Sequence, residues 1–469
     1  MRETLEMALN AAVDFLDGLD HNSVAPIADR ATLLARFSPD LPEYGGTPNQ
    51  VVRELADGVK GGIMGSTGPR FFGWVIGGAL PAAVAADWLT TAWDNNAAMY
   101  ACSPAASVVE EICGGWLKQI LGLPEYASFA LTTGCQMAHV TCLAAARHAV
   151  LAKQGWDVEE RGLNGAPPIE VIYAGDPHAS IERALRLLGL GRPGAGLTAS
   201  AFMDKSYRHK AGARILILQA GDINTGAFDN FEAIIPAAKE RGAWVHVDGA
   251  FGLWAAASPL YRHLVEGVEL ADSWATDGHK WLNTPFDCGY AFVVDSKSHR
   301  AATSQRAAYL THATDARDQL DWNPDWSRRA RGFPTYAALR QLGRAGICEL
   351  IERCCNNARA LVHGIGGLDG AEVLVEPIIN QGLIRFGDRT DEVIEAINRS
   401  GEAFFTGTTW QGKRAMRVSV CNWRTTEHDI RRTIDCVRTI LDECCVRNNA
   451  ELRCGSAIAR GTEKSFSDS

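Results

Sequence analysis

The stretch that decides the fold is WVHVDGA, residues 244–250, an apolar run that ends on an acid beside small residues. Such a run is typical of a buried strand, and the turn residues that follow it place the Asp248 carboxylate at the carboxyl end of that strand. A second run, DSWATDGHK at residues 272–280, has the same pattern and ends on Lys280. We therefore expect two opposite charges at neighbouring strand ends.

Strand-like runs and helical patterns alternate on both sides of this stretch. The alternation predicts an α/β fold with a mainly parallel sheet wrapped by helices, in which active-site residues gather at the carboxyl ends of the strands. The predicted strands are 129–132, 169–173, 215–219, 244–248, 272–276 and 289–294, and the predicted helices between them are 137–153, 180–188 and 231–241.

The C-terminal third predicts a small α/β domain. A long helical pattern is followed by short strand patterns and a second helix. The predicted helices are 345–365 and 426–443, and the predicted strands between them are 371–375, 383–386 and 416–420.

The composition is that of a compact soluble protein, with 46% hydrophobic and 22% charged residues. The formal net charge of -9 leaves no broad basic field, so we expect neither nucleic acid nor a membrane as a partner. No secretion signal and no run of about 18 apolar residues is found in the sequence, which favours a cytoplasmic protein. The 13 cysteines form no spaced CxxC pair, so we expect reduced thiols and no metal site.

The lysine and the acid at the two strand ends suit pyridoxal 5'-phosphate (PLP) chemistry. A lysine amine carries this cofactor as a Schiff base, and an acid keeps the pyridine nitrogen protonated so that the ring accepts electrons. Lys280 and Asp248 fit these roles. Taken singly, each is more often a surface lysine or a loop acid, but together they favour the PLP interpretation.

On residues 246–250 and 279–288 the chain resembles the group II PLP-dependent decarboxylases, the family of aromatic-L-amino-acid and glutamate decarboxylases. The resemblance extends more loosely over residues 20–445. It implies the PLP-dependent transferase-like fold of aspartate aminotransferase (fold type I), with a mainly parallel seven-stranded sheet in the large domain and a small α/β C-terminal domain. It also implies a homodimer with the active site at the interface. The implied parts are an N-terminal helical arm at 1–82, a large PLP-binding domain at 83–345 and a small domain at 346–454. Residues 455–469 are polar and patternless, so we expect a disordered tail there.

Several cofactor contacts follow from the same resemblance. His178 matches the histidine that stacks on the pyridine ring, although it could be incidental to a helix-capping loop, and Ala250 matches the small residue packed under the ring. The turn of Gly134, Cys135 and Gln136 matches the phosphate-binding turn, where backbone amides at a helix start hold an anion. Cys135 and Gln136 depart from the family's small and hydroxyl residues, so the expected contacts are those of the backbone.

Other candidates are carried over from looser matches. Asn224 and Thr225 lie in a segment that resembles the family's strand-end turn at the cofactor, with an ordinary turn as an almost equal alternative. Phe71, Phe72 and Tyr309 are substrate-contact candidates, although aromatic residues are more often part of the core. The catalytic candidates are Lys280, Asp248, His178 and His279.

The resemblance implies decarboxylation of an L-amino acid to the amine and carbon dioxide. Family members commonly protonate the product from a loop tyrosine that precedes an arginine-rich segment, matched here by 328–331, but residues 311–327 contain no tyrosine. A decarboxylating aldehyde synthase and a side-chain lyase or aldolase therefore remain alternatives, with a catalytically idle binding subunit as a more remote one. The cluster of Arg328, Arg329 and Arg331 is interpreted as a solvated helix start, with the holding of a loop or an anion as the alternative.

Overall fold

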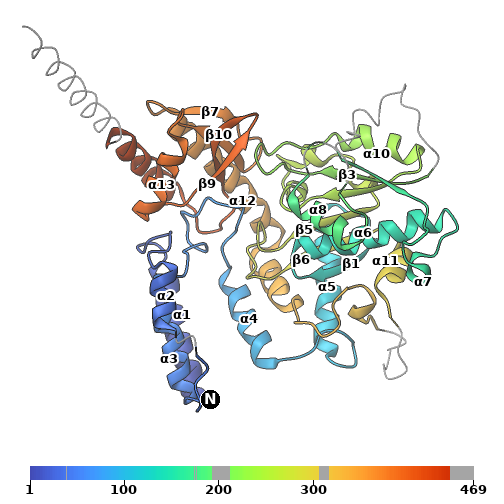
Figure 1. Ribbon diagram of the computed structural model, residues 1–469, viewed down its shortest axis with the longest axis horizontal. Coiled ribbons are helices and arrows are strands. Elements are labelled where there is room, and N and C mark those ends of the chain that lie inside the picture. The colour runs from blue at the N-terminus through green and yellow to red at the C-terminus, as the bar shows by residue number, and fades with distance from the viewer. Residues whose placement is uncertain (38–39, 174, 176, 193–211, 306–315, 444–469) are drawn as a thin grey trace, which may run out of the picture.

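The centre of the larger lobe is a mixed sheet with the strand order β1-β6-β5-β4-β3-β2 (Figure 1). The computed structural model describes residues 1–37, 40–173, 175, 177–192, 212–305 and 316–443. The strands are β1 (Ser128–Thr132), β2 (Ile169–Tyr173), β3 (Ala213–Gln219), β4 (Trp244–Asp248), β5 (Ser273–Asp277) and β6 (Gly289–Val293).

The pairing makes this sheet mainly parallel. Strands β2 to β5 pair in parallel, and β6 runs antiparallel to both of its neighbours, β1 and β5. Each predicted strand of this region is confirmed, with small shifts at the ends. The seventh strand implied by the resemblance is not found among the described residues.

Both faces of the sheet are covered by helices, so alternate strand residues enter two separate cores. Ile215 and Ile217 of β3 pack on the side of α6 (Cys135–Ala152) and α8 (Ala179–Leu187). Leu216 and Leu218 face the opposite core. Burial on both faces explains why the strands read as continuous apolar runs. The helices on the second side are α5 (Pro104–Leu121), α10 (Phe231–Glu240) and part of α12 (Gly332–Gly366).

The ends of these helices have local causes. The Ser103 side chain accepts a hydrogen bond from the Ala106 N–H at the start of α5, and Pro104 occupies the first turn. The same helix ends at Gly122, which has a φ of 67°. The remaining short elements of this lobe are α7 (Val158–Arg161), α11 (Ser296–Thr303) and the 3₁₀ helices η1 (Gly252–Ala257), η2 (Arg262–Val265), η3 (Val268–Leu270) and η4 (Gln319–Asp321).

Helix α12 connects the large lobe to the small one, and it is interrupted at Gly343, with φ 61° and ψ -179°. The small lobe has an antiparallel sheet with the order β7-β8-β10-β9. The predicted long helix, the three predicted strands and the last predicted helix are confirmed. The elements of this lobe are β7 (Glu372–Val375), β8 (Gln381–Arg385), α13 (Thr390–Ser400), β9 (Thr406–Trp410), β10 (Lys413–Ser419) and a helix over 427–443.

Two elements of the small lobe were not predicted. Strand β9 has the sequence TGTTW, whose polar and glycine residues give no apolar pattern, and it lies at the edge of its sheet. Helix α13 did carry a signal, because its apolar residues at 393, 394 and 397 have helical spacing and are buried. The predicted tail at 455–469 lies outside the described residues.

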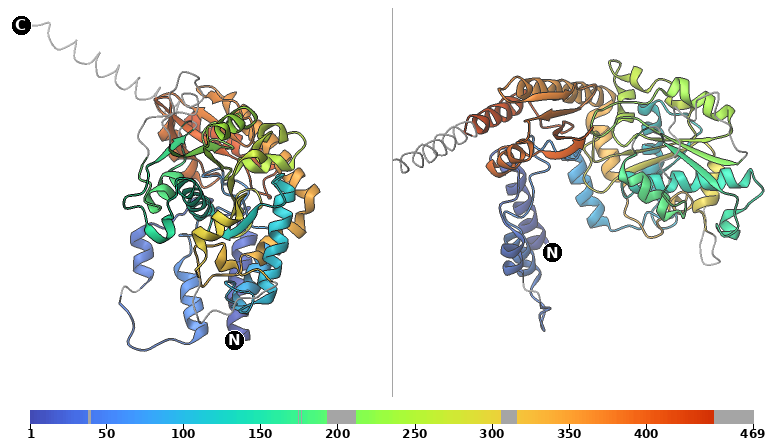
Figure 2. Two further views of the ribbon diagram at one scale, coloured as in Figure 1. Left: turned by 90° about the vertical axis from the view of Figure 1, so that its right-hand side faces the viewer. Right: turned by 45° about the horizontal axis from the view of Figure 1, so that its top comes forward.

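The N-terminal helices project from the rest of the chain as a separate arm (Figures 1 and 2). The arm contains α1 (Arg2–Gly18), α2 (Arg30–Arg36) and α3 (Pro48–Gly58), and α1 packs against α3 but has no buried residue. The following helix, α4 (Pro81–Trp93), packs along α12. None of the described helices has the length and apolar character needed to cross a bilayer.

The cluster of Arg328, Arg329 and Arg331 is not a solvated helix start, so that prediction is wrong. Arg328 and Arg331 are buried, and an Arg328 nitrogen lies 2.7 Å from a carboxylate oxygen of Glu110. Arg331 Nε lies 2.7 Å from Asp287 Oδ1. The arginines hold together α5 and the loops beside the sheet, which corresponds to the alternative weighed for them.

Candidate active site

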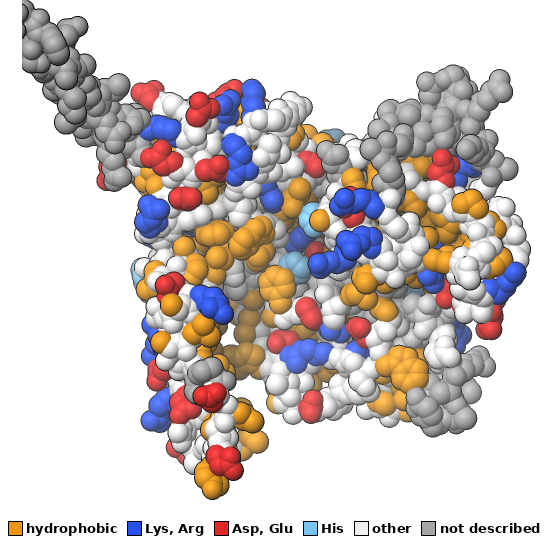
Figure 3. Space-filling view, in the orientation of Figure 1, with side chains coloured by type: hydrophobic (Ala, Val, Ile, Leu, Met, Phe, Trp, Pro, Cys, Tyr) orange, Lys and Arg blue, Asp and Glu red, His pale blue; other side chains and the backbone are white. Residues whose placement is uncertain are grey.

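A cavity of about 330 Å³ opens where the carboxyl ends of β1 to β5 meet. In Figure 3, pale-blue histidine side chains lie at the centre of the visible face, in a depression between the two lobes and beside hydrophobic side chains. Eight of the residues that line the cavity were predicted from the sequence: Gly134, Cys135, Gln136, His178, Asp248, Ala250, His279 and Lys280.

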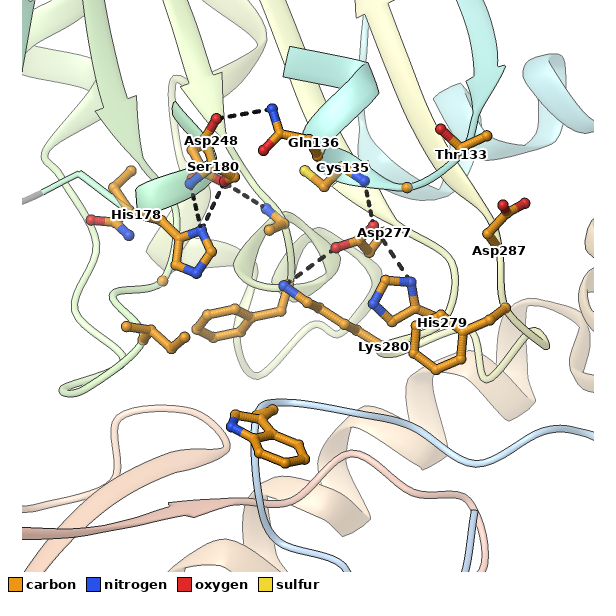
Figure 4. A pocket seen from close by; sticks show the side chains of 18 residues that line it. Thr133, Cys135, Gln136, His178, Ser180, Asp248, Asp277, His279, Lys280 and Asp287 are labelled. Carbon is orange, nitrogen blue, oxygen red and sulfur yellow. Dashed lines mark hydrogen bonds and ion pairs between the residues drawn. The ribbon is translucent and has the colours of Figure 1, made fainter. Parts of the chain in front are cut away.

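Lys280 projects into this cavity from the turn that follows β5 (Figure 4). Its Nζ lies 3.3 Å from Asp277 Oδ2, and it is largely shielded from solvent. Burial alone would lower the pKa of the amine, but the negative charges of Asp277 and Asp248 outweigh burial and raise it above its ordinary value. Lys280 is therefore a protonated ammonium at neutral pH in the protein as it stands.

Asp277 connects the lysine to the start of α6. The Cys135 N–H donates a hydrogen bond of 2.6 Å to Asp277 Oδ1, and His279 Nδ1 lies 3.6 Å from the same oxygen. The Cys135 N–H has no partner within the helix and binds the Asp277 carboxylate instead. This helix start is therefore suited to an anion. Asp277 was not predicted as a site residue, although its position at a strand end three residues before Lys280 was a usable signal.

The turn before α6 is held close to the sheet. Gly134 has a φ of 104°, and a Cβ at Gly289 of β6 would come within 2.2 Å of the Gly134 carbonyl carbon. Only glycine at 289 permits this approach of backbone to backbone. The turn that was predicted to bind phosphate therefore has a fixed place at the carboxyl end of β1.

Asp248 is the last residue of β4, and it is 5% exposed at the wall of the cavity. Its Oδ1 accepts a hydrogen bond of 3.1 Å from the Ala250 N–H, and His139 Nε2 lies 3.6 Å from the same oxygen. No hydrogen bond to Oδ2 is found among the described residues. One carboxylate oxygen is held by the protein, and the other is available to a ligand.

Two histidines border the cavity. The His178 side chain caps α8, with Nδ1 2.8 Å from Ser180 Oγ, and its ring lies at the rim. The His279 ring stacks on Phe286, with 4.3 Å between centroids, and is fixed in place by that contact. Burial lowers the pKa of both imidazoles, and the charge of Lys280 lowers each further, so both are neutral at neutral pH.

Asn224 and Thr225 are not among the residues that line the cavity. Both backbone amides donate to Asp222 Oδ1, and Asn224 Oδ1 accepts a hydrogen bond of 3.1 Å from Thr408 Oγ1 in β9. They form the ordinary turn that was weighed as the alternative. Gly221 and Ile223 of this segment line the cavity in their place.

Phe71 and Phe72 are core residues. The Phe71 ring stacks on Phe404 at 5.0 Å, the Phe72 ring stacks on Phe405 at 5.3 Å, and neither lines the cavity. Trp74, in the same segment, does line it. Trp74 is 49% exposed and has a left-handed backbone, with a φ of 53°. Tyr309 lies outside the described residues.

The donor set fits PLP. The cavity contains one lysine amine, one partly free buried carboxylate and a helix start that binds an anion, which are the groups needed for the aldehyde, the pyridine nitrogen and the phosphate. The remaining lining residues, which were not among the predicted site residues, are Trp74, Thr133, Ser180, Gln219, Gly221, Ile223, Phe251, Asp277, Phe286 and Asp287.

Comparisons with known proteins agree with this geometry. Residues 31–386 match the family model described as the pyridoxal-dependent decarboxylase conserved domain. Tryptophan decarboxylase 1 of Oryza sativa subsp. japonica is 26% identical over 490 residues, with 94% of each chain covered. Phenylacetaldehyde synthase of Petunia hybrida is 26% identical over 454 residues, which cover 87% of this chain and 88% of the relative.

A solved structure, Oryza sativa TDC with PLP and tryptamine, has a TM-score of 0.85 to this chain at 24% identity. The match covers 94% of this chain and 98% of that one, and it confirms the predicted fold type I architecture. PLP is confirmed as the cofactor by the family model. The chain belongs to the pyridoxal-dependent decarboxylase family, and it is a PLP-dependent carboxy-lyase.

Proposed function

We propose that this chain decarboxylates an aromatic or similarly bulky L-amino acid, with PLP held covalently by Lys280. The observation that carries the proposal is the shared cavity, in which the Lys280 amine, the Asp248 carboxylate and the anion-binding start of α6 all face one space. Each of these groups comes from the carboxyl end of a different strand.

PLP, when bound, supplies the electron sink that takes up the electron pair left when carbon dioxide departs. Asp248 would contribute a negative charge that favours a proton on the pyridine nitrogen. The N–H groups at the start of α6 would hold the phosphate, and His178 would contact the ring from the cavity wall. Lys280, with its raised pKa, can hold a proton at Nζ inside the cavity.

The choice of an aromatic substrate rests on the residues that line the cavity. Trp74, Phe251 and Phe286 provide apolar surface. Among the described lining residues, Lys280 is the sole lysine or arginine, so an acidic substrate side chain has no permanent cation to pair with. The name of the Oryza sativa relative, a tryptophan decarboxylase, supports the same class.

A second candidate function is oxidative decarboxylation to an aldehyde. It is favoured by the lack of a tyrosine at 311–327 and by the similarity to a phenylacetaldehyde synthase. In that reaction the amino acid, oxygen and water give the aldehyde, carbon dioxide, ammonia and hydrogen peroxide. The simple decarboxylase gives only the amine and carbon dioxide.

Product analysis tests the proposal and separates the two reactions. The PLP-loaded protein is supplied with L-tryptophan, L-tyrosine, L-phenylalanine and, as the acidic control, L-glutamate, while carbon dioxide, amine, aldehyde and peroxide are measured. Equal amounts of amine and carbon dioxide from an aromatic substrate support the proposal, and aldehyde with peroxide supports the second candidate. Turnover of glutamate alone, or products that persist in Lys280→Ala, would contradict both.

We also propose a homodimer with the active site at the interface. Supporting this, the arm helix α1 exposes Leu5, Leu9 and Val13, and α4 exposes Trp88 and Trp93, which leaves apolar surface for a second copy to cover. Light scattering of the full chain should give twice the monomer mass. A monomer at micromolar concentration that decarboxylates normally would contradict the proposal.

The division into an arm at 1–82, a large domain at 83–345 and a small domain at 346–454 stays a proposal. The interruption of α12 at Gly343 supports a boundary near 345. A cytoplasmic location is likewise proposed, supported by the free cysteines of the described residues, and cell fractionation tests it.

A further inference from the structure

A line of five buried polar side chains runs beneath the candidate cofactor site. His139 Nδ1 lies 3.0 Å from His246 Nε2, and His246 Nδ1 lies 2.9 Å from Ser273 Oγ. Trp244 Nε1 donates to the same hydroxyl at 2.9 Å. At the other end, His139 Nε2 lies 3.6 Å from Asp248 Oδ1. The line therefore connects α6, β5 and two positions of β4 to the acid at the cavity wall.

The indole at the far end determines the direction of the hydrogen bonds. Trp244 Nε1 can only donate, so Ser273 Oγ accepts from it and has its own proton to give. That proton is given to His246 Nδ1, and His246 Nε2–H then donates to His139 Nδ1. His139 consequently carries its proton on Nε2, directed toward the carboxylate of Asp248.

The opposite direction is disfavoured on two counts. It would leave the Ser273 proton without an acceptor among the described residues, although the hydroxyl is fully buried. It would also place the lone pair of His139 Nε2 against the Asp248 carboxylate. Cys135 Sγ, 3.3 Å from the same nitrogen, is a weak partner and does not compensate for that repulsion.

Both imidazoles in the line are neutral. Burial lowers the pKa of His139 to about 3. The negative charge of Asp277 opposes this fall, and the positive charge of Lys280 adds to it. Burial likewise lowers the pKa of His246 to about 3, although the negative charge of Asp248 opposes this fall. A neutral donor orients a carboxylate without cancelling its charge, whereas an arginine or lysine in this place would compete with a protonated ring nitrogen for it.

We propose that His139 is a positioning residue that directs an N–H toward Asp248 Oδ1 and keeps Oδ2 free and charged for the pyridine nitrogen, with His246, Ser273 and Trp244 fixing its tautomer. The inference rests on the proposed role of Asp248. It extends that role to a histidine that does not line the cavity and has no expected contact with cofactor or substrate.

Two variants of similar size test the inference. His139→Leu fills the space without a donor, and His139→Gln keeps an amide N–H close to the place of Nε2. Each is loaded with PLP that carries ¹⁵N in the ring, and the ¹⁵N chemical shift is measured together with the PLP dissociation rate, kcat and KM. In His139→Leu the shift should move toward the unprotonated value, with kcat lowered about tenfold and KM little changed. His139→Gln should restore most of both.

His299 offers a matched control, because it is a second buried histidine paired with a hydroxyl, with Nδ1 2.9 Å from Ser128 Oγ, and it does not line the cavity. His299→Leu should lose stability but keep the native ¹⁵N shift. If His139→Leu does not fold, Ser273→Ala removes the far end of the line and should give a smaller shift in the same direction.

Three results would overturn the inference. One is a native ¹⁵N shift and a native dissociation rate in His139→Leu, and another is a native shift in Ser273→Ala. The third is a stoichiometric metal ion in the purified protein, because Cys135, His139 and Asp248 place ligand atoms within 4.8 Å of one another. Failure of the native chain to bind PLP would instead contradict the proposed function, so the two failures are distinguishable.

Discussion

Two buried clusters of the large lobe each contain a basic and an acidic side chain, but their surroundings differ. In the first, Arg328 and Glu110 form a pair whose side chains are both 0% exposed, and Arg328 also donates to the carbonyls of Ala97 and Leu131. In the second, Lys280 and Asp248 face a cavity of about 330 Å³. The charges of the first cluster are paired with each other inside the protein, and those of the second face a space that a ligand can occupy.

Burial alone therefore does not mark a functional charge. A buried pair that faces other protein groups acts on stability, since removing one partner leaves an uncompensated charge in a low-dielectric surrounding. A buried charge that faces a cavity is maintained at a cost in stability and is expected to act on a ligand. Substitutions in the two clusters should accordingly move different observables.

Glu110→Ala should have the largest effect, and it should be on stability. It leaves Arg328 charged and unpaired, so the free energy of unfolding should fall by about 3–5 kcal/mol. Urea denaturation measures this. Glu111→Ala, at the exposed neighbouring position of α5, is the control and should change stability by at most about 0.5 kcal/mol. Equal effects of the two variants would contradict the structural role.

Asp248→Asn should act on activity instead. The amide oxygen can still accept the Ala250 N–H, but the charge is lost, so decarboxylation should fall about a hundredfold with less than about 1 kcal/mol change in stability. Asp272→Asn is the control, because Asp272 accepts the Val245 N–H at the opposite edge of the sheet. Retained activity in Asp248→Asn would show that the charge of Asp248 is not needed for decarboxylation.

Asp277→Asn should change the pH dependence of cofactor loading. Without this carboxylate one of the charges that raise the pKa of Lys280 is lost and the pKa falls, so a larger fraction of the amine is unprotonated and reactive at neutral pH. For a fall of about one unit, the rate of PLP attachment near neutral pH rises about tenfold. Absorbance time courses across pH measure it.

The control for this change is Asp287→Asn, because Asp287 also lines the cavity but pairs with Arg331. Its loading profile should keep the native pH dependence. An unshifted profile in Asp277→Asn would show that Asp277 does not hold the lysine proton.

Substitution of Asp229 should have the smallest effect, and this effect should be on the pH dependence of stability. Burial raises its pKa from 3.8 to about 6, and its Oδ2 accepts the Gln219 N–H at 2.7 Å. Because the folded state binds the proton more tightly than the unfolded state, stability should fall as the pH rises from about 4 to about 6. Asp229→Asn should remove this fall. Above about pH 6 the variant should therefore be more stable than the native protein by about 1 kcal/mol. Denaturation midpoints that keep the native pH dependence would contradict this.

The sheet and the placement of Lys280 and Asp248 could be predicted from the sequence because the signal is local. Each strand is an apolar run bounded by turn residues, and a charge directly after such a run lies at the carboxyl end of the strand. The turn of Gly134 could be placed for the same reason, since it lies between a strand and a helix.

The remaining site residues depend on packing between distant segments. His139 is one of two histidines in an alanine-rich helix, and only the packing of α6 on β4 brings it to Asp248. Trp74 differs from the buried Phe71 and Phe72 because a left-handed backbone turns it toward the cavity. No periodicity in the sequence reports such contacts.

The most direct test of the central claim is to identify the residue that binds PLP. The PLP-loaded protein is treated with borohydride, which makes the covalent link permanent, and its peptides are analysed by mass spectrometry. Lys280 should carry the added pyridoxyl group in stoichiometric amount, and the group should be absent in Lys280→Ala. A label on another lysine, or no label in the native protein, would contradict the assignment of this cavity as the active site.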